Sequence, residues 1–385
     1  MARRLVVCCD GTWNVATQRC RTNVAKVARA VLPVTATGTE QRVRYLDGVG
    51  TRPSERLRGG AFGWGLSRKV RDAYCFLVEN YEPGDELYLF GFSRGAFTAR
   101  SLAGLVRNSG ILRLEHENRL QEAWDLYRDR GKEPDAQESR DFREDFSHPT
   151  RIRFIGVWDT VGALGIPVPG PHLLKPLATL VNRLWAFHNT ELSSWVDGAF
   201  HALAVDERRR AFAPALWHQQ PGAEEQGQQL KQVWFSGVHV DVGGGYPDTS
   251  QSDLSLRWMV ANAAAHGLQF DSAALGLGAD RPLGDLHESR TKLYRLTRPL
   301  NRPVGQSRNA RDHRLDGREF VAATAELRYD TPEQHYAPPE LRRYFDNPDG
   351  VHIEPVPDLP VTRRPTTPLL LPGLRSPNDP ARQPS

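Results

Sequence analysis

The feature that most constrains this sequence is an apolar run that enters Gly91-Phe92-Ser93-Arg94-Gly95 and continues into a stretch of small residues. This order predicts a strand, a sharp turn and a helix, with the Ser93 hydroxyl exposed at the carboxyl end of the strand. Gly91 and Gly95 lack the Cβ atoms that would collide with backbone at such a turn. The pattern alone is weak, but its context favours Ser93 as a nucleophile over an ordinary β-to-α turn. The backbone N–H of Arg94, at the helix start, is a candidate oxyanion donor.

Short apolar runs rich in β-branched residues recur along the chain, with helical patterns between several of them. These runs are Leu5–Cys9, Val43–Leu46, Leu87–Phe90, Ile152–Val157 and Val233–Phe235. Alternation of strands and helices predicts an α/β fold, α/β-hydrolase-like, with a mostly parallel sheet flanked by helices. The stretch 66–78 predicts a crossover helix, and Arg208–Phe212 is a possible further strand, although its arginines make it a poor central one.

We expect one catalytic domain over residues 1–354, with insertions at about 115–148 and 167–197. The first insertion is strongly charged and predicts a surface helix and loop, a candidate cap. The second carries apolar residues at helical spacing from Leu177 to Trp185, which fits either a helix packed on the core or a lid that presents an apolar face to lipid. Residues 355–385 are rich in proline and poor in aromatics, and we expect a disordered tail there.

A serine at such a turn requires an acid and a histidine, which this kind of fold supplies later in the chain, each at the carboxyl end of a strand. Asp159 ends one of the apolar runs and is the preferred acid. Asp206 is the alternative, and a helix-capping role for Asp159 stays open. His239 follows the last predicted strand and is the preferred general base, with His201 as its competitor. His239 would take the Ser93 proton while Asp159 holds the tautomer of the ring.

Two loops are expected at the same edge of the sheet. Asp10, Gly11 and Thr12 follow the first strand, and the N–H groups of Gly11 and Thr12 are candidates to complete an oxyanion hole, with Asp10 in support. The alternative is a plain turn, because Asp-Gly is a common turn dipeptide. Asp241 lies in the glycine-rich loop after His239, where it could orient the loop or bind a metal.

Composition excludes several other classes of function. The four cysteines, at positions 8, 9, 20 and 75, form no zinc-binding pattern, and no P-loop lysine follows the glycine-rich turns, so neither metal nor cofactor is expected. A net charge of +4 with dispersed arginine argues against nucleic acid as a partner. No apolar stretch is long enough for a transmembrane helix or a signal peptide, so a cytoplasmic location is expected, with signal-independent export left open. Oligomeric state is not indicated.

Five segments together form a pattern that is far more specific than the serine motif. They are Cys9-Asp10-Gly11-Thr12-Trp13-Asn14, Asp47-Gly48-Val49-Gly50-Thr51, Phe90-Gly91-Phe92-Ser93-Arg94-Gly95-Ala96-Phe97, Gly156-Val157-Trp158-Asp159-Thr160-Val161-Gly162 and Gly237-Val238-His239-Val240-Asp241-Val242-Gly243-Gly244-Gly245-Tyr246. The chain resembles the α/β-hydrolase family that includes the first class of type VI secretion lipase effectors, which are phospholipases. The resemblance implies the fold, ester hydrolysis and a Ser-Asp-His mechanism at Ser93, Asp159 and His239.

The expected function is therefore that of a serine hydrolase cleaving carboxylic esters, with lipid or phospholipid acyl esters as the favoured substrates. Peripheral contact with a membrane is compatible with such a substrate. Two alternatives stay open: a soluble short-chain esterase, and a catalytically silent module that binds a ligand or partner at the same edge of the sheet.

Overall fold

A computed structural model describes residues 2–12, 14–15, 17–48, 61–129, 131–161, 191–278, 281–291, 294–295, 298–308, 315–347 and 350–359. One eight-stranded sheet runs through these residues in the order β12-β11-β10-β8-β6-β3-β1-β2, and every neighbouring pair is parallel. Its strands are β1 (Arg4–Cys9), β2 (Gln41–Leu46), β3 (Glu86–Phe92), β6 (Ile152–Trp158), β8 (Val196–Ala204), β10 (Gln229–Phe235), β11 (Glu319–Ala322) and β12 (Ile353–Glu354).

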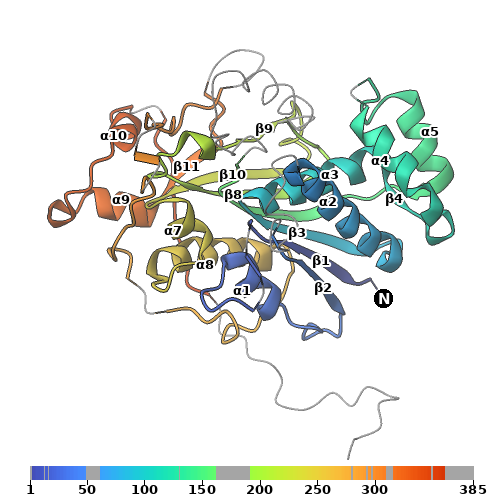
Figure 1. Ribbon diagram of the computed structural model, residues 1–385, viewed down its shortest axis with the longest axis horizontal. Coiled ribbons are helices and arrows are strands. Elements are labelled where there is room, and N and C mark those ends of the chain that lie inside the picture. The colour runs from blue at the N-terminus through green and yellow to red at the C-terminus, as the bar shows by residue number, and fades with distance from the viewer. Residues whose placement is uncertain are drawn as a thin grey trace, which may run out of the picture.

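Helices cover both faces of the sheet (Figure 1). On one face lie α1 (Asn23–Ala30), α7 (His239–Gly243) and α8 (Ser250–Ala265), and on the other lie α2 (Ala61–Asn80) and α3 (Arg94–Ser109). The described C-terminal part adds α9 (Ala323–Tyr329) and α10 (Pro339–Phe345) beside β11. None of the helices in the described ranges is both long and apolar enough to cross a lipid bilayer.

The strand order reverses at β1, which lies between β2 and β3. The chain passes from β1 outward to β2, then returns across β1 to build the rest of the sheet from β3. In open parallel sheets, loops leave such a switch point in opposite directions and open a crevice at the carboxyl ends of the strands. The ends of β1 and β3, with Asp10 and Ser93, therefore lie at the position where this architecture favours a binding site.

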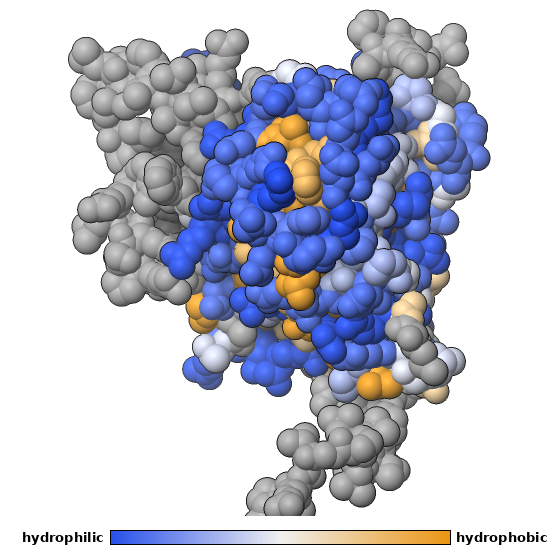
Figure 2. Space-filling model, turned by 90° about the vertical axis from the view of Figure 1, so that its right-hand side faces the viewer, coloured by the Kyte–Doolittle hydropathy of each residue, from blue (hydrophilic) through white to orange (hydrophobic). Residues whose placement is uncertain are grey.

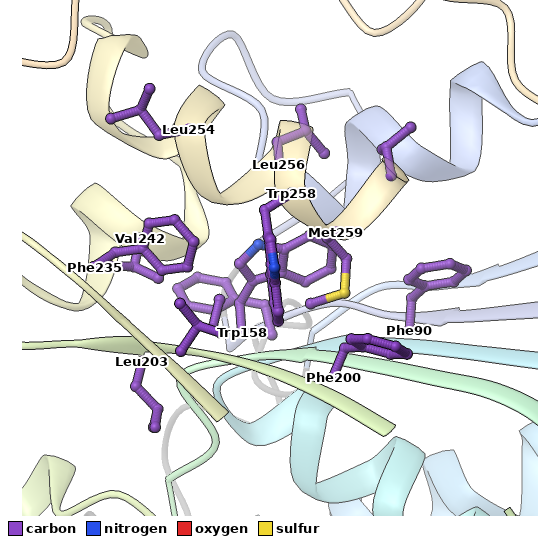
Figure 3. Packing of buried hydrophobic residues seen from close by; sticks show 14 of the residues in the cluster. Phe90, Trp158, Phe200, Leu203, Phe235, Val242, Leu254, Leu256, Trp258 and Met259 are labelled. Carbon is purple, nitrogen blue, oxygen red and sulfur yellow. The ribbon is translucent and has the colours of Figure 1, made fainter. Parts of the chain in front are cut away.

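Each face of the sheet buries its own apolar cluster. On the α8 face, Trp258 and Met259 lie against Phe200 and Phe90, which come from β8 and β3 (Figure 3). The central strand β6 has a glycine beneath this helix. A Cβ on Gly156 would lie 2.5 Å from the sulfur of Met259, so the glycine gives the helix room to pack closely on the strand.

The first predicted insertion forms α4 (Leu120–Arg128) and α5 (Gln137–Phe146), preceded by a 3₁₀ helix over Leu114–Arg119. It begins and ends in a small antiparallel pair, β4 (Ile111–Leu112) with β5 (Ser147–His148). Figure 2 shows this side of the molecule as largely hydrophilic with scattered apolar spots. The sequence predicted one surface helix and a loop here, whereas the segment forms two helices, α4 and α5, within its charged sequence.

The five predicted strands and the crossover helix are present, but three strands of the main sheet, β8, β11 and β12, were not predicted, and Arg208–Phe212 is wrong as a strand. Its residues Arg210–Phe212 form a 3₁₀ turn instead. Strand β8 was missed because its sequence, VDGAFHALA, is rich in alanine, contains glycine, aspartate and histidine, and so lacks the β-branched apolar run that marked the predicted strands. The predicted lid helix, over 177–185, and residues 360–385 of the predicted tail lie outside the described residues.

The last strands are tied to the body of the domain by a buried carboxylate. Glu354 on β12 accepts a hydrogen bond from the indole N–H of Trp258 at 3.0 Å and another from Lys231 Nζ at 2.7 Å. Trp258 is completely buried. Its N–H would have no partner without Glu354.

We expect Glu354→Ala to lower the free energy of unfolding by about 1–3 kcal/mol, since a buried donor left unpaired loses its hydration without compensation. Urea denaturation followed by tryptophan fluorescence measures the change. Glu333→Ala, at an exposed position, is the matched control and should leave stability within about 0.5 kcal/mol of the wild type. Equal stability of the two variants would contradict the anchoring role.

Candidate active site

Ser93 lies at a sharp turn between β3 and α3. Its backbone has φ 57° and ψ −119°, a conformation that side-chain-bearing residues rarely adopt. A Cβ on Gly91 would lie 2.6 Å from the Cα of Ala96, and a Cβ on Gly95 would overlap the carbonyl oxygen of Cys9 at the end of β1. Both glycines are therefore required by close backbone approach, and the turn holds the serine at the carboxyl edge of the sheet.

Asp159 lies directly beside this turn. The N–H of Ser93 donates to the carbonyl oxygen of Trp158 at 3.0 Å, and Asp159 follows with φ 39°. The Asp159 carboxylate is fully buried, and its Oδ2 lies 2.5 Å from Nδ1 of His239. Its Oδ1 accepts the backbone N–H of Ala204 at 3.1 Å, at the end of β8. The structure thus brings together the acid and the histidine that the sequence favoured.

The His239 ring is held between two aromatic side chains. Phe92, which precedes Ser93, lies 4.7 Å from it between ring centroids, and Phe212 meets it edge-on at 4.9 Å. Since Nδ1 faces Asp159, Nε2 is the nitrogen left for proton transfer. No hydrogen bond joins the described side chains of Ser93 and His239, which is common before substrate binds.

A residue that sequence reasoning missed completes this arrangement. Arg302 is buried, and its guanidinium pairs with both oxygens of Asp159, at 2.6 and 3.0 Å. Burial acts to raise the pKa of Asp159, but the charge of Arg302 and the hydrogen bond to His239 outweigh it and hold that pKa well below its usual range. No periodicity or motif surrounds Arg302, so the sequence carried no signal for it.

The two alternatives from the sequence lie elsewhere. Asp206 accepts the N–H of Gly237 at 2.6 Å and the hydroxyl of Tyr336 at 2.8 Å, and burial raises its pKa to about 6. It braces the loop before His239 instead of touching the ring. His201 is a core residue of β8 whose Nε2 accepts the N–H of Thr160 at 3.0 Å, and burial lowers its pKa to about 3. A ring nitrogen occupied in this way is not placed to act on Ser93.

The loop after β1 lies beside the serine turn, at the edge of the sheet where the sequence predicted it, and its N–H groups differ in availability. The N–H of Gly11 donates to Oδ1 of Asp10 at 2.6 Å, while Oδ2 accepts the hydroxyls of Thr22 at 2.6 Å and Tyr45 at 2.5 Å. Burial raises the pKa of Asp10 to about 6. Gly11 is therefore engaged within the loop. The sequence favoured the N–H of Thr12; the structure adds its buried hydroxyl, which has no hydrogen-bond partner among the described residues, as a candidate donor beside Arg94.

Asp241 orients the histidine loop. Its Oδ2 accepts the N–H groups of Val238 at 3.0 Å and His287 at 3.1 Å, and its Oδ1 lies 2.6 Å from Nδ1 of His287. Of the two roles that the sequence left open, the geometry favours loop orientation. The described ranges contain no group of three or more His, Cys, Asp or Glu side chains that could hold a metal ion.

Comparison with known proteins gives a family match over most of this chain. Residues 3–262 match a family model described as the catalytic domain of the type VI secretion (T6SS) phospholipase effector Tle1-like proteins. An uncharacterised protein of Saccharomyces cerevisiae is 29% identical over 234 residues, which cover 54% of this chain and 32% of the yeast protein. The chain thus spans about a third of the length of the curated relative that it matches.

Two solved structures overlap the chain at low similarity. An uncharacterised protein from Pseudomonas aeruginosa has a TM-score of 0.40 at 19% identity, and the overlap covers 72% of this chain and 48% of the Pseudomonas chain. A lipase/esterase from Lactobacillus plantarum has a TM-score of 0.31 at 15% identity, and the overlap covers 68% of this chain and 86% of the Lactobacillus chain. The fold assignment follows from the strand order and not from overlaps this low.

We expect Gly95→Ala to lower the free energy of unfolding by more than about 3 kcal/mol, since its Cβ would overlap backbone that cannot move aside. Gly104→Ala on the same helix is the matched control, because its Cβ would meet only the side chain of Tyr127, at 3.0 Å. Thermal unfolding of the two variants gives the comparison. A Gly95 variant as stable as the Gly104 variant would rule out the close approach to β1.

The buried His201 predicts a pH-dependent loss of stability. Its pKa in the folded protein is about 3, below the ordinary 6.5, so the unfolded chain binds the proton more readily. The contribution of His201 to the free energy of unfolding is therefore fully present above pH 6.5 and is lost progressively as the pH drops toward 3. Between pH 7 and 5 the wild type should therefore lose about 2 kcal/mol more than His201→Gln.

Urea unfolding at both pH values measures this difference. The control is His335→Gln, which removes an exposed imidazole and should show the pH response of the wild type. Parallel pH responses of wild type and His201→Gln would contradict a neutral buried imidazole at this position.

Proposed function

The chain belongs to the family of Tle1-like phospholipase effector catalytic domains of type VI secretion, and we propose that it hydrolyses phospholipid acyl esters with Ser93 as its nucleophile. The observation that carries the proposal is the buried hydrogen bond of 2.5 Å between Asp159 and His239, beside the strained turn that presents Ser93. These are the three side-chain types of acyl transfer through a serine, in the chain order typical of α/β-hydrolases. The description of the family supports a lipid ester as the substrate.

In the proposed mechanism, Ser93 Oγ attacks the ester carbonyl carbon while His239 Nε2 takes the hydroxyl proton. The oxyanion that forms is stabilised by the N–H of Arg94 at the start of α3 and by Thr12. His239 then returns the proton to the departing alcohol, leaving an acyl group on Ser93. A water molecule, deprotonated by His239, then attacks the acyl carbonyl carbon. The bond to Ser93 Oγ breaks, the fatty acid leaves, and the proton held by His239 returns to Oγ. Asp159 fixes the ring tautomer and stabilises the imidazolium throughout.

We expect Ser93→Ala to abolish fatty acid release from phosphatidylcholine vesicles and labelling by a fluorophosphonate probe, because both require the serine oxygen. Ser109→Ala, at the other end of the same helix, is the matched control. It removes a buried hydroxyl bonded to the carbonyl of Ala123 at 3.0 Å and should keep the activity of the wild type. Folded wild-type protein that neither reacts with the probe nor releases fatty acid would point to a binding module instead.

The substrate class is tested by the same proteins on a short soluble ester such as p-nitrophenyl butyrate. A phospholipase should release acyl chains from vesicles at a rate that the soluble ester does not match at equal ester concentration. Faster turnover of the soluble ester, with vesicles left intact, would assign the chain as a short-chain esterase and leave the Ser93 mechanism in place.

A further inference from the structure

The guanidinium of Arg302 joins three segments at the carboxyl edge of the sheet. One terminal nitrogen donates to Asp159 Oδ1 at 2.6 Å and to the carbonyl oxygen of Ala204 at 2.7 Å. The other donates to Asp159 Oδ2 at 3.0 Å and to the carbonyl oxygen of Phe212 at 2.6 Å. The side chain is fully buried. It therefore connects the end of β6, the end of β8 and the 3₁₀ turn that carries Phe212.

We propose that Arg302 is a positioning residue for the reaction at Ser93, acting through Asp159 and Phe212 to hold the His239 ring in place. The proposal rests on the function proposed above. Arg302 does not reach the reacting atoms. Its effect is on the two groups that contact the imidazole, the carboxylate at Nδ1 and the aromatic ring at its side.

The contacts explain how the carboxylate is oriented. A planar guanidinium that pairs with both oxygens of a carboxylate fixes the plane of that carboxylate, which a single point charge does not. Oδ1 of Asp159 is further held by the N–H of Ala204, so Oδ2 stays directed at the ring. On the other side, Arg302 holds the backbone of Phe212, whose ring lies edge-on to His239.

The charge of Arg302 has a second effect. Among the described residues, the titratable groups that interact with the Asp159–His239 pair are Arg302, Glu207 and the buried, neutral imidazole of His201. Glu207 accepts the backbone N–H of His239 at 3.4 Å. Glu207 also pairs with Arg209 at 2.8 Å, so the negative charge of Glu207 is already matched. Without Arg302, the uncompensated Asp159 carboxylate would favour the imidazolium. The base form that Ser93 needs would then be present only at higher pH.

The segment around Arg302 is itself firmly placed. The N–H of Leu300 donates to the carbonyl oxygen of Arg208 at 2.8 Å, and the N–H groups of Gly305 and Ser307 donate to Glu319 on β11 at 3.0 and 2.6 Å. Arg302 lies well beyond residue 262, where the match to the catalytic family model ends. The part of the chain after that match thus contributes directly to the order of the active site.

The experiment compares kcat and KM over pH 5–9 for the wild type, Arg302→Gln, Arg302→Lys and Arg328→Gln. Arg328 is the matched control: it is also buried in the C-terminal part, but it bonds to Gln334 and the carbonyl of Pro282. For Arg302→Gln we expect kcat to fall on the order of 10²-fold with KM nearly unchanged, the scale at which misplaced catalytic groups act. The acid limb of its pH profile should move to higher pH, so that alkaline conditions recover part of the activity.

Arg302→Lys retains the positive charge but loses the planar guanidinium that pairs with both oxygens of Asp159. The acid limb of its pH profile should therefore stay near that of the wild type while kcat falls. If Arg302→Gln does not fold, Arg302→Lys decides the question through its kcat. A wild-type kcat in either variant overturns the proposal. The proposal also fails if Arg302→Gln and Arg328→Gln both lose kcat by the same factor at every pH. Failure of Ser93 itself is recognised separately, because then the wild type would show no probe labelling and no turnover.

Discussion

The proposed active site depends on one buried negative charge, the carboxylate of Asp159. Asp159 has no exposed surface, and an ionised carboxylate in that position costs several kcal/mol unless charged and polar partners replace its hydration. The structure supplies these partners from three places: the imidazole of His239, the guanidinium of Arg302 and the backbone N–H of Ala204. Each partner comes from a different strand end or loop. Satisfying the carboxylate therefore draws the carboxyl edge of the sheet into a single arrangement.

The serine turn is the complementary constraint, and it is steric instead of electrostatic. The unusual backbone of Ser93 is stable because the surrounding segments leave it no alternative: the start of α3 presses on β1 at Gly95 and on β3 at Gly91. Strain of this kind persists only where the rest of the fold determines it. The parallel sheet does so here, since β1 and β3 lie side by side in register from Arg4 with Glu86 to Cys9 with Gly91.

Sequence reasoning was strong where a residue must follow a strand and weak where a residue arrives through packing. Ser93, Asp159 and His239 each follow an apolar run, so the rule that parallel strands end at one edge was enough to place them. Arg302 follows no strand and belongs to no repeat, and its role appears only when the chain returns to the sheet edge. Strand β8 was missed for a related reason, because Gly198 is required by contact with His266, and Ala202 and Ala204 lie in the buried core.

These two kinds of prediction reflect how the site is divided along the chain. The groups assigned to the chemistry lie within residues 3–262, where local pattern and family resemblance both apply. The groups that order them extend further, through Arg302 to Glu319 on β11 and from β12 back to α8 through Glu354 and Trp258. A long-range ion pair such as Asp159 with Arg302 leaves no local pattern in either segment. The C-terminal strands therefore do more than widen the sheet: they hold the segment that supplies the counter-charge of Asp159.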